Sequence, residues 1–335
     1  MSQLCPIAGL CQNCDWIDLS AAEAAQRLCT NIQNRFQHPV DEFHPSPART
    51  HYRSRIQLRP NKEGRLSYSQ PRSTLNIPIE DCSIADPLIN AALKKLGPCP
   101  KGVQRVEFRT NGQLLQLSAQ SKRQDQSLKK ALVAWAEPTS DSIALNGEIL
   151  HGIKRMPYTF GGVQHQLRPQ SFTQVNLPLN EQLISRVVSL AHEQNPSQIL
   201  DLYSGVGNFS FPLASTGIPV IAMESAPSSV YDARDTQERT QLPVEIQVKN
   251  IDTFAAGDVF CEVVILDPPR SGAPGIFPKL TLTLPKRIIY ISCFPQSLAR
   301  DMKSLGSKYK LSRIEVFEMF PQTHHGEVLA VFDKV

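Results

Sequence analysis

The sequence predicts an α/β protein with two differently built halves. The C-terminal half should form a doubly wound parallel sheet, and the N-terminal half a β-rich α+β module. After Gln170, short apolar runs alternate with helical segments, which is typical of parallel strands joined by helices. Before Gln170, strand-like runs dominate, and Cys5, Cys11 and Cys14 stand within ten residues. A length of 335 residues suits two domains better than one small core.

The composition is that of an ordinary globular protein. Hydrophobic residues make up 41% of the chain and charged residues 20%, which excludes collagen-like, disordered and coiled-coil classes. No apolar run approaches the length of a membrane-spanning helix. The N-terminus has neither a basic start nor a long apolar stretch, so no secretory signal is predicted. We therefore expect a cytoplasmic protein without membrane contact.

Positive charge is concentrated in the N-terminal half. Residues 1–170 contain 21 Lys and Arg against 14 Asp and Glu, and residues 51–135 contain 15 against 6. Lys and Arg bind polyanions by displacing the counterions of phosphate groups, so this excess favours a nucleic-acid partner. A solvated basic face is the alternative that charge alone leaves open.

The N-terminal elements are predicted in the following order. A helix over 16–36 carries a capping box formed by Ser20 and Glu23, and residues 38–50 form a connection. A β-hairpin is expected over 51–79 around Asn-Lys-Glu-Gly, followed by a helix over 85–97. Further strands are expected in the runs VEFRT, LLQLSAQ, ALVAWAE, SIALNGEIL and TFGGVQHQLRP, between residues 103 and 170.

The C-terminal elements begin with an amphipathic helix over 178–195. Four buried strands follow, one ending near Asp201 and the others within 219–225, 260–269 and 287–293. In such sheets ligands bind at the carboxyl ends of the strands, so the residues that follow each strand are the candidates for a site.

A glycine-rich turn follows the first of these strands, at Asp201-Leu202-Tyr203-Ser204-Gly205-Val206-Gly207-Asn208-Phe209. Ser210 stands where a dinucleotide-binding motif would have its third glycine, which argues against a pyrophosphate ligand. Glu224 ends the next strand, where a carboxylate can accept hydrogen bonds from both ribose hydroxyls, although alone it could be a solvated strand end. Together these features favour an adenosine ligand, and S-adenosylmethionine fits better than NAD because it has no phosphates.

Three residues at strand ends suggest covalent catalysis on a pyrimidine. Asp267 precedes Pro-Pro, Cys293 ends the strand at 287–293, and Glu327 begins the last strand. Singly, they could be a turn residue, a packing cysteine and a solvated acid. Together they match a reaction in which a thiolate adds to C6 of uracil, C5 attacks an electrophilic methyl group, and a carboxylate removes the C5 proton.

Six segments of the C-terminal half resemble, in order and spacing, the S-adenosylmethionine-dependent RNA 5-methyluridine methyltransferases. They are SFTQVN (171–176), DLYSGVGNF (201–209), AMES (222–225), DPPRSG (267–272), YISCFP (290–295) and EMFPQTHHGEV (318–328). The resemblance implies a Rossmann-like methyltransferase sheet, Cys293 as nucleophile and Glu327 as base. It also implies cofactor contacts from Gln174, Tyr203, Asn208, Glu224, Asn250 and Asp267, of which Asp267 could also orient the uracil.

The N-terminal cysteines extend the resemblance. Cys5, Cys11, Cys14 and the later Cys82 resemble the four-cysteine [4Fe–4S] site in the family's ribosomal RNA branch. Zinc is the chemical alternative for such a ligand set. Cys82 is preferred to Cys99 because Glu-Asp-Cys followed by a helix is similar to the family's pattern. Cys29 and Cys261 are expected to be packing residues. The stretch Tyr52-Arg53-Ser54-Arg55 resembles the family's basic strand, which implies contact with RNA phosphates.

The sequence departs from the family at Phe294, where Asn is usual, and at Gln322, where some relatives have His. It also lacks a preceding TRAM-type β-barrel domain, which points to the compact ribosomal RNA branch and to 23S ribosomal RNA as substrate. We expect an iron–sulfur region at 1–90, a central RNA-binding region at 91–170 and a methyltransferase domain at 171–335. The alternatives are a tRNA uridine-C5 methyltransferase, an inactive iron–sulfur RNA-binding protein and an NAD-dependent oxidoreductase.

Overall fold

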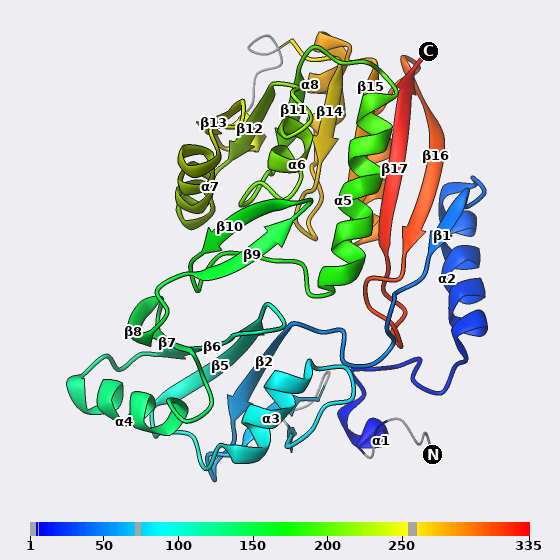
Figure 1. Ribbon diagram of the computed structural model, residues 1–335. Helices are drawn as coiled ribbons and strands as arrows, with labels where there is room; N and C mark the ends of the chain where they lie inside the picture. The colour runs from blue at the N-terminus through cyan, green and yellow to red at the C-terminus, as the bar shows by residue number, and fades with distance from the viewer. Residues whose placement is uncertain (1–4, 6, 71–74, 254–259) are drawn as a thin grey trace.

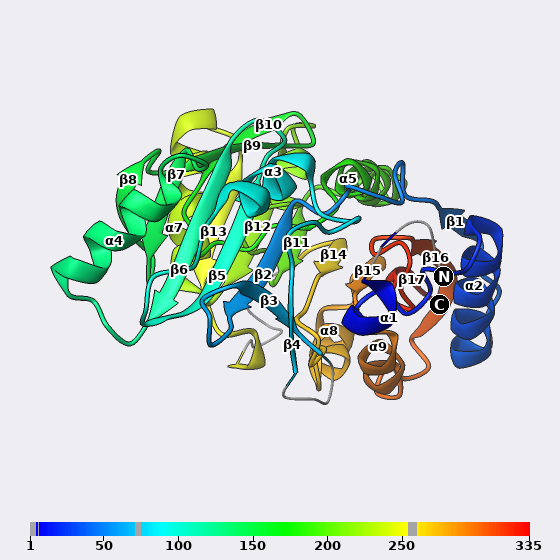
Figure 2. The same ribbon diagram turned by 90° about the horizontal axis from the view of Figure 1, so that it is seen from below.

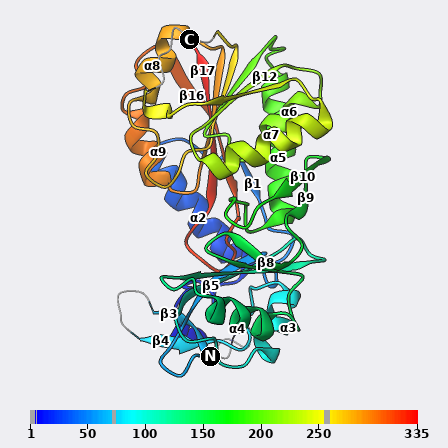
Figure 3. The ribbon, with the colours of Figure 1, turned by 90° about the vertical axis from the view of Figure 1, so that its left-hand side faces the viewer.

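A large sheet flanked by helices lies above a smaller β-rich module in the computed structural model, which describes residues 5, 7–70, 75–253 and 260–335 (Figure 1). The side view in Figure 3 shows the two parts stacked, with the chain's N-terminus in the lower one. Residues 1–4 and 6 of the cysteine-rich start, and residues 71–74 of the predicted hairpin region, lie outside the described residues.

The large sheet has the strand order β1-β16-β17-β15-β14-β11-β12-β13 in the described part of the chain. β17 runs antiparallel to both of its neighbours, and the other pairs are parallel. The strands are β1 (Glu42–His44), β11 (Ile199–Leu202), β12 (Val220–Glu224), β13 (Val244–Val248), β14 (Val263–Leu266), β15 (Arg287–Ser292), β16 (Tyr309–Phe317) and β17 (Glu327–Lys334). The predicted α/β class is confirmed, with a mixed rather than wholly parallel sheet.

Helices cover both faces of this sheet. Alternate residues of each central strand point to opposite faces, so Val263 and Ile265 join one apolar cluster while Val264 and Leu266 join the other. The first face carries α5 (Leu177–His192), α6 (Ser210–Ala214) and α7 (Pro227–Thr240). The second carries α2 (Ala21–Phe36), α8 (Ile276–Thr283) and α9 (Pro295–Met302). A short 3-10 helix, η1 (Ile251–Thr253), follows β13.

The smaller module is built on a seven-stranded sheet of order β4-β3-β2-β5-β6-β7-β8. Its strands are β2 (Arg55–Pro60), β3 (Leu66–Ser69), β4 (Asn76–Pro78), β5 (Val103–Thr110), β6 (Leu115–Ser121), β7 (Ser142–Leu145) and β8 (Glu148–Gly152). The helices α3 (Pro87–Lys95) and α4 (Gln126–Ala136) pack on it in a third apolar cluster. A separate hairpin, β9 (Met156–Phe160) and β10 (Val163–Leu167), connects this module to α5 (Figure 2).

Several local predictions are confirmed. The β2–β3 hairpin turns at Asn61–Gly64, where the Gly64 N–H donates to the Asn61 carbonyl at 3.0 Å. The capping box is present at the start of α2: the Glu23 N–H donates to the Ser20 hydroxyl, and the Ser20 N–H donates to the Glu23 carboxylate. The helix itself begins at Ala21, so residues 16–20 precede it.

The expected strand ALVAWAE, residues 131–137, is wrong: these residues continue helix α4. Asp125 caps that helix by accepting a hydrogen bond from the Leu128 N–H, and Leu128, Leu132 and Ala136 form its buried stripe. The flanking strands β6 and β7 pair in parallel, which requires a crossover connection, and α4 supplies it.

The connection expected over 38–50 contains a strand. β1 pairs in parallel with β16 at the edge of the large sheet, with Phe43 opposite Val316. The smaller sheet takes strands from both of the ranges 1–90 and 91–170, so the division of the N-terminal half at residue 90 stays a proposal. No helix of the described residues is long and apolar enough to span a membrane.

Candidate functional site

The loop after β11 has the backbone of a ligand-binding turn. Tyr203, Gly205 and Gly207 all have positive φ, at 62°, 57° and 90°. A Cβ atom at Gly207 would lie 2.4 Å from the Phe211 ring, so only glycine fits there. A Cβ at Gly205 would meet nothing within 4 Å, so this side of the turn is open and has room for a ligand.

Glu224, at the end of β12, ties this loop to the next one. Its carboxylate accepts hydrogen bonds from the backbone N–H groups of Gly205 at 3.0 Å, Ser225 at 2.6 Å and Ala226 at 2.7 Å. The Ser225 hydroxyl also donates to Oε1, at 3.4 Å, so three donors face Oε1, while Oε2 accepts only from Gly205 among the described residues and has room for one further donor. The side chain is positioned at the strand end that the sequence predicted for a ribose contact.

The other predicted cofactor residues surround the same edge of the sheet. The Asn208 amide exchanges hydrogen bonds with the Asn180 amide of α5, at 2.8 and 3.1 Å. Gln174 is buried in the segment between β10 and α5. Asn250 is exposed after β13, and its carbonyl accepts from the Thr253 N–H at 3.0 Å.

Asp267, Cys293 and Glu327 come together at the carboxyl ends of the central strands. Asp267 follows β14, and Cys293 follows β15 directly. Ser292 pairs with Val328 in the antiparallel ladder, so the next pair in register is Cys293 opposite Glu327. Three segments separated by 26 or more residues therefore deliver a thiol and two carboxyl groups to one place.

Burial dominates the electrostatics of this group. Burial, followed by the negative charges of Glu327 and Asp267, raises the pKa of the Cys293 thiol to about 12, while the Arg270 guanidinium opposes that shift. Burial and the charge of Asp267 raise the pKa of Glu327 well above its usual range. Neither Glu327 carboxyl oxygen has a hydrogen-bond partner among the described residues. Both shifts favour the uncharged forms of the thiol and of Glu327 when no ligand is bound.

Ser210, which stands in place of the third glycine, has a structural role through its contact with Asp201. The Ser210 hydroxyl donates to the fully buried Asp201 carboxylate at 2.5 Å. Burial raises the pKa of Asp201 to about 7, and Asp201 in turn helps burial to raise the pKa of Asp267 to about 7. Ser210 thus holds the carboxyl group that begins the glycine-rich turn.

Four of the eight cysteines line one cavity of about 600 Å³. Cys5 and Cys82 add to burial in raising the thiol pKa values of Cys11 and Cys14. The cavity lies between the N-terminal turn, the smaller sheet and the loop before β17, which contributes Phe320, Thr323 and His325. Cys99 is buried in the apolar cluster of the small module and does not line this cavity, unlike Cys82.

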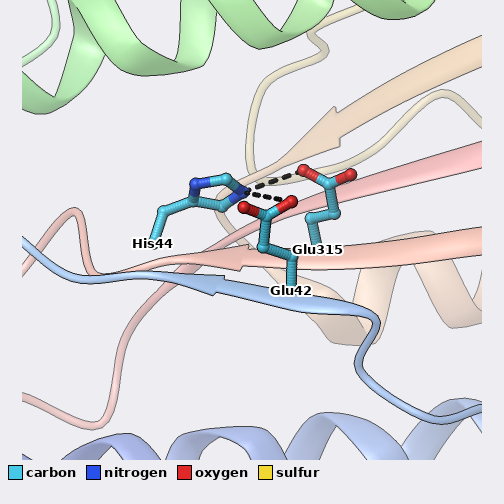
Figure 4. A group of neighbouring side chains, drawn as sticks. All are labelled: Glu42, His44 and Glu315. Carbon is cyan, nitrogen blue, oxygen red and sulfur yellow. Dashed lines mark hydrogen bonds and ion pairs between the residues drawn. The ribbon is translucent and has the colours of Figure 1, made fainter.

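A second cluster of possible metal ligands is an ion-pair network. Glu42, His44 and Glu315 bring their ligand atoms within 4.8 Å of one another between β1 and β16 (Figure 4). Glu315 is fully buried and accepts three hydrogen bonds from Arg186, at 2.6 to 2.9 Å. A guanidinium already neutralises this carboxylate, so a divalent cation would be repelled, and the group fastens β1 to the sheet.

Arginines occupy the outer face of β2. Ile56 and Leu58 point into the core, while Arg53, Arg55 and Arg59 alternate with them on the opposite side. Arg53 and Arg59 line the cysteine cavity. The Arg55 guanidinium lies 4.8 Å from the centre of the Phe172 ring. Phe172 is 55% exposed.

Comparison with known proteins identifies the family. The tRNA (Uracil-5-)-methyltransferase family matches residues 104–251 and 245–335, which together exceed half of the chain. The chain belongs to this family. The resemblance to RNA 5-methyluridine methyltransferases is thereby confirmed, and with it S-adenosylmethionine as the methyl donor.

Curated relatives that align with most of the chain include methyltransferases of ribosomal RNA. The 23S rRNA (uracil(1939)-C(5))-methyltransferase RlmD of Salmonella typhimurium is 27% identical and aligns over 99% of this chain and 81% of its own length. RlmD of Shewanella sediminis is 33% identical over 84% of this chain and 68% of its own. In fold, the chain is similar to the Pyrococcus abyssi tRNA (uracil-54, C5)-methyltransferase solved with S-adenosyl-L-homocysteine, with a TM-score of 0.81, 24% identity and coverage of 95% and 85%.

Two side chains at this family's site escaped the sequence reasoning. Arg270 belongs to the Asp-Pro-Pro-Arg segment, but its effect on the Cys293 thiol depends on the folding of two separate loops. Phe172 belongs to the SFTQVN segment, but its exposure and its contact with Arg55 arise only in the folded chain. An exposed aromatic residue has no sequence signal that separates it from a core residue.

Proposed function

We propose that the protein methylates C5 of a uridine in 23S ribosomal RNA, with Cys293 as nucleophile and Glu327 as base. The observation that carries this proposal is the meeting of a half-buried thiol and a fully buried, unpartnered carboxyl group at the ligand-binding edge of the sheet. The choice of ribosomal RNA rests on the RlmD relatives, which align with nearly the whole chain.

Cys293 and Glu327 need their negative charges at different steps of the reaction, so both can work in one pocket. Two negative charges so close oppose each other, so thiolate and carboxylate are not favoured together. The thiolate is needed first, when it adds to C6. Addition to C6 moves the negative charge from sulfur onto the uracil ring, as an enolate. C5 of the enolate takes the electrophilic methyl group that bound S-adenosylmethionine supplies, which removes this charge, and ionisation of Glu327 then becomes easier. Glu327 then removes the C5 proton, and Cys293 leaves as a thiolate.

The cofactor is proposed to bind along the carboxyl ends of β11, β12 and β14. The open side of Gly205 and the remaining acceptor position on Oε2 of Glu224 fit an adenosine group. The residues proposed to contact the cofactor are Gln174, Tyr203, Asn208, Glu224, Asn250 and Asp267. A role for Asp267 in orienting the uracil fits its place beside Cys293 and Glu327.

RNA is proposed to lie across the arginine-bearing face of the smaller sheet. Arg53, Arg55 and Arg59 can neutralise phosphates, and the exposed Phe172 ring can stack on a base. The target uridine must leave the base stack to reach Cys293, since its C6 atom is inaccessible inside a stacked helix.

Cys5, Cys11, Cys14 and Cys82 are proposed to hold a [4Fe–4S] cluster. Four thiols around one cavity are the usual ligand set. A single zinc ion would draw its sulfur ligands to about 4 Å from one another, because each Zn–S bond is roughly 2.3 Å long. Zinc is the chemical alternative for the same four thiols, and the metal content of the purified protein distinguishes the two.

The cluster proposal predicts that protein purified without oxygen contains iron and acid-labile sulfide and absorbs visible light. Cys82→Ser should remove most of the iron, whereas Cys99→Ser, a change outside the cavity, should retain it. Zinc in the wild-type protein, or equal iron loss in both variants, would contradict the assignment. We expect a role in folding or RNA docking. A reversible switch of turnover with the cluster's oxidation state would exclude a purely structural cluster.

The function is tested by methyl transfer from labelled S-adenosylmethionine to unmodified total RNA, which is then separated by size and digested to nucleosides. We expect label in 5-methyluridine of the 23S fraction. Label confined to the tRNA fraction would transfer the proposal to tRNA. Absence of label, with protein that binds S-adenosylmethionine, would favour an inactive RNA-binding protein.

A further inference from the structure

Phe294 has a contact that the usual asparagine could not make. It follows Cys293 and precedes α9, and the Arg270 guanidinium carbon lies 5.8 Å from the centre of its ring. The backbone of Phe294 is fixed on both sides: its N–H donates to the Ser292 hydroxyl at 3.2 Å, and its carbonyl accepts from the Ser297 hydroxyl at 2.8 Å. These bonds fix the backbone from which the ring projects toward Arg270.

Arg270 supplies a positive charge where the nucleophile needs one. The charged groups that act on the Cys293 thiol are Glu327 on β17, Asp267 after β14, and Arg270 itself. The two acids oppose a thiolate, and the guanidinium favours it. Arg270 is exposed, and a free arginine side chain has many conformations in water. An aromatic face that attracts the cation reduces that freedom.

We propose that Phe294 is a positioning residue, which holds the Arg270 guanidinium beside the Cys293 sulfur and so makes the thiolate easier to form. This inference rests on the proposed role of Cys293 as nucleophile. Phe294 thereby acts through Arg270, without touching the reacting atoms. The departure from asparagine is, on this view, an alternative way of activating the cysteine.

The test measures alkylation of Cys293 by iodoacetamide across a range of pH, in protein without RNA or S-adenosylmethionine. Mass spectrometry of the peptide that contains Cys293 separates it from the other cysteines. Phe294→Leu removes the aromatic face but keeps an apolar side chain. We expect it to slow alkylation at neutral pH by roughly three- to tenfold, which corresponds to a rise of about half to one unit in the thiol pKa. Phe294→Tyr should restore the wild-type rate.

Arg270→Gln completes a double-mutant cycle. It should slow alkylation at least as much as Phe294→Leu, and the double variant should be no slower than Arg270→Gln alone. An unchanged rate in Phe294→Leu, or the same additional loss in the Arg270→Gln background, would overturn the proposal. Thermal melting of each variant identifies loss of folding. If the proposed function is wrong, the protein will transfer no methyl group to RNA, while the pH dependence of Cys293 alkylation stays as described.

Discussion

Changing Cys293 to alanine should abolish methyl transfer and leave the affinity for S-adenosylmethionine nearly unchanged. The thiol forms the covalent bond that activates C5. Among the described residues, the neighbouring carboxyl groups of Glu327 and Asp267 cannot replace it, because they are poor nucleophiles toward carbon. We expect turnover to fall by a factor on the order of 10⁴ or more. The measurement is label transfer to RNA, with cofactor affinity determined on the same preparation.

Cys29→Ala is the matched control for this variant. Cys29 lies in α2, half-buried and outside both the pocket and the cysteine cavity. It should retain wild-type turnover. Substantial methylation by Cys293→Ala would refute covalent catalysis by this residue, whatever the control shows.

Glu327→Gln should trap a covalent complex between protein and RNA. Glutamine has almost the same shape but cannot accept the C5 proton, so the methylated adduct forms and the thiolate cannot leave. In the wild-type protein the buried carboxyl group has no hydrogen-bond partner among the described residues. Its oxygens are therefore not occupied by a protein donor when the substrate binds. Denaturing gels of the variant, incubated with RNA and S-adenosylmethionine, should show a slowly migrating complex.

The double variant Cys293→Ala with Glu327→Gln is the control, because it lacks the sulfur that forms the bond. It should show no complex. If the single Glu327→Gln variant also shows none, while it still binds RNA and the cofactor, another group removes the proton.

The predictable part of the fold is the part whose signals are local. The strands that end at Leu202, Leu266 and Ser292 are apolar runs stopped by glycine, proline or a polar turn, so their ends, and with them the site, can be located from the sequence. ALVAWAE was misread because a short apolar run fits a strand or a buried helix equally well. The deciding signal lay six residues before it, at the helix cap Asp125.

The features of the fold and the site that could not be predicted depend on contacts between distant segments. The residues Glu42–His44 carry no local signal for a strand, because the strand depends on pairing with β16, some 270 residues away. In the same way, spacing alone could not choose between Cys82 and Cys99 as the fourth thiol. The resemblance favoured Cys82, and Cys82, unlike Cys99, lines the cavity. The effect of Arg270 on Cys293 likewise arises from two loops that meet after folding.

The position of β1 has a consequence for how the chain matures. Residues 42–44 are synthesised long before β16, the strand that receives them, which lies some 270 residues later in the chain. Closing so long a loop is entropically costly, and until it closes β16 is an edge strand with free backbone donors and acceptors. The Trp16 N–H, which donates to the Gln322 carbonyl at 2.9 Å, must wait for the same stage. The thiol-rich segment therefore reaches its final place only after residues 309–322 have been synthesised, so any metal centre there assembles after that stage.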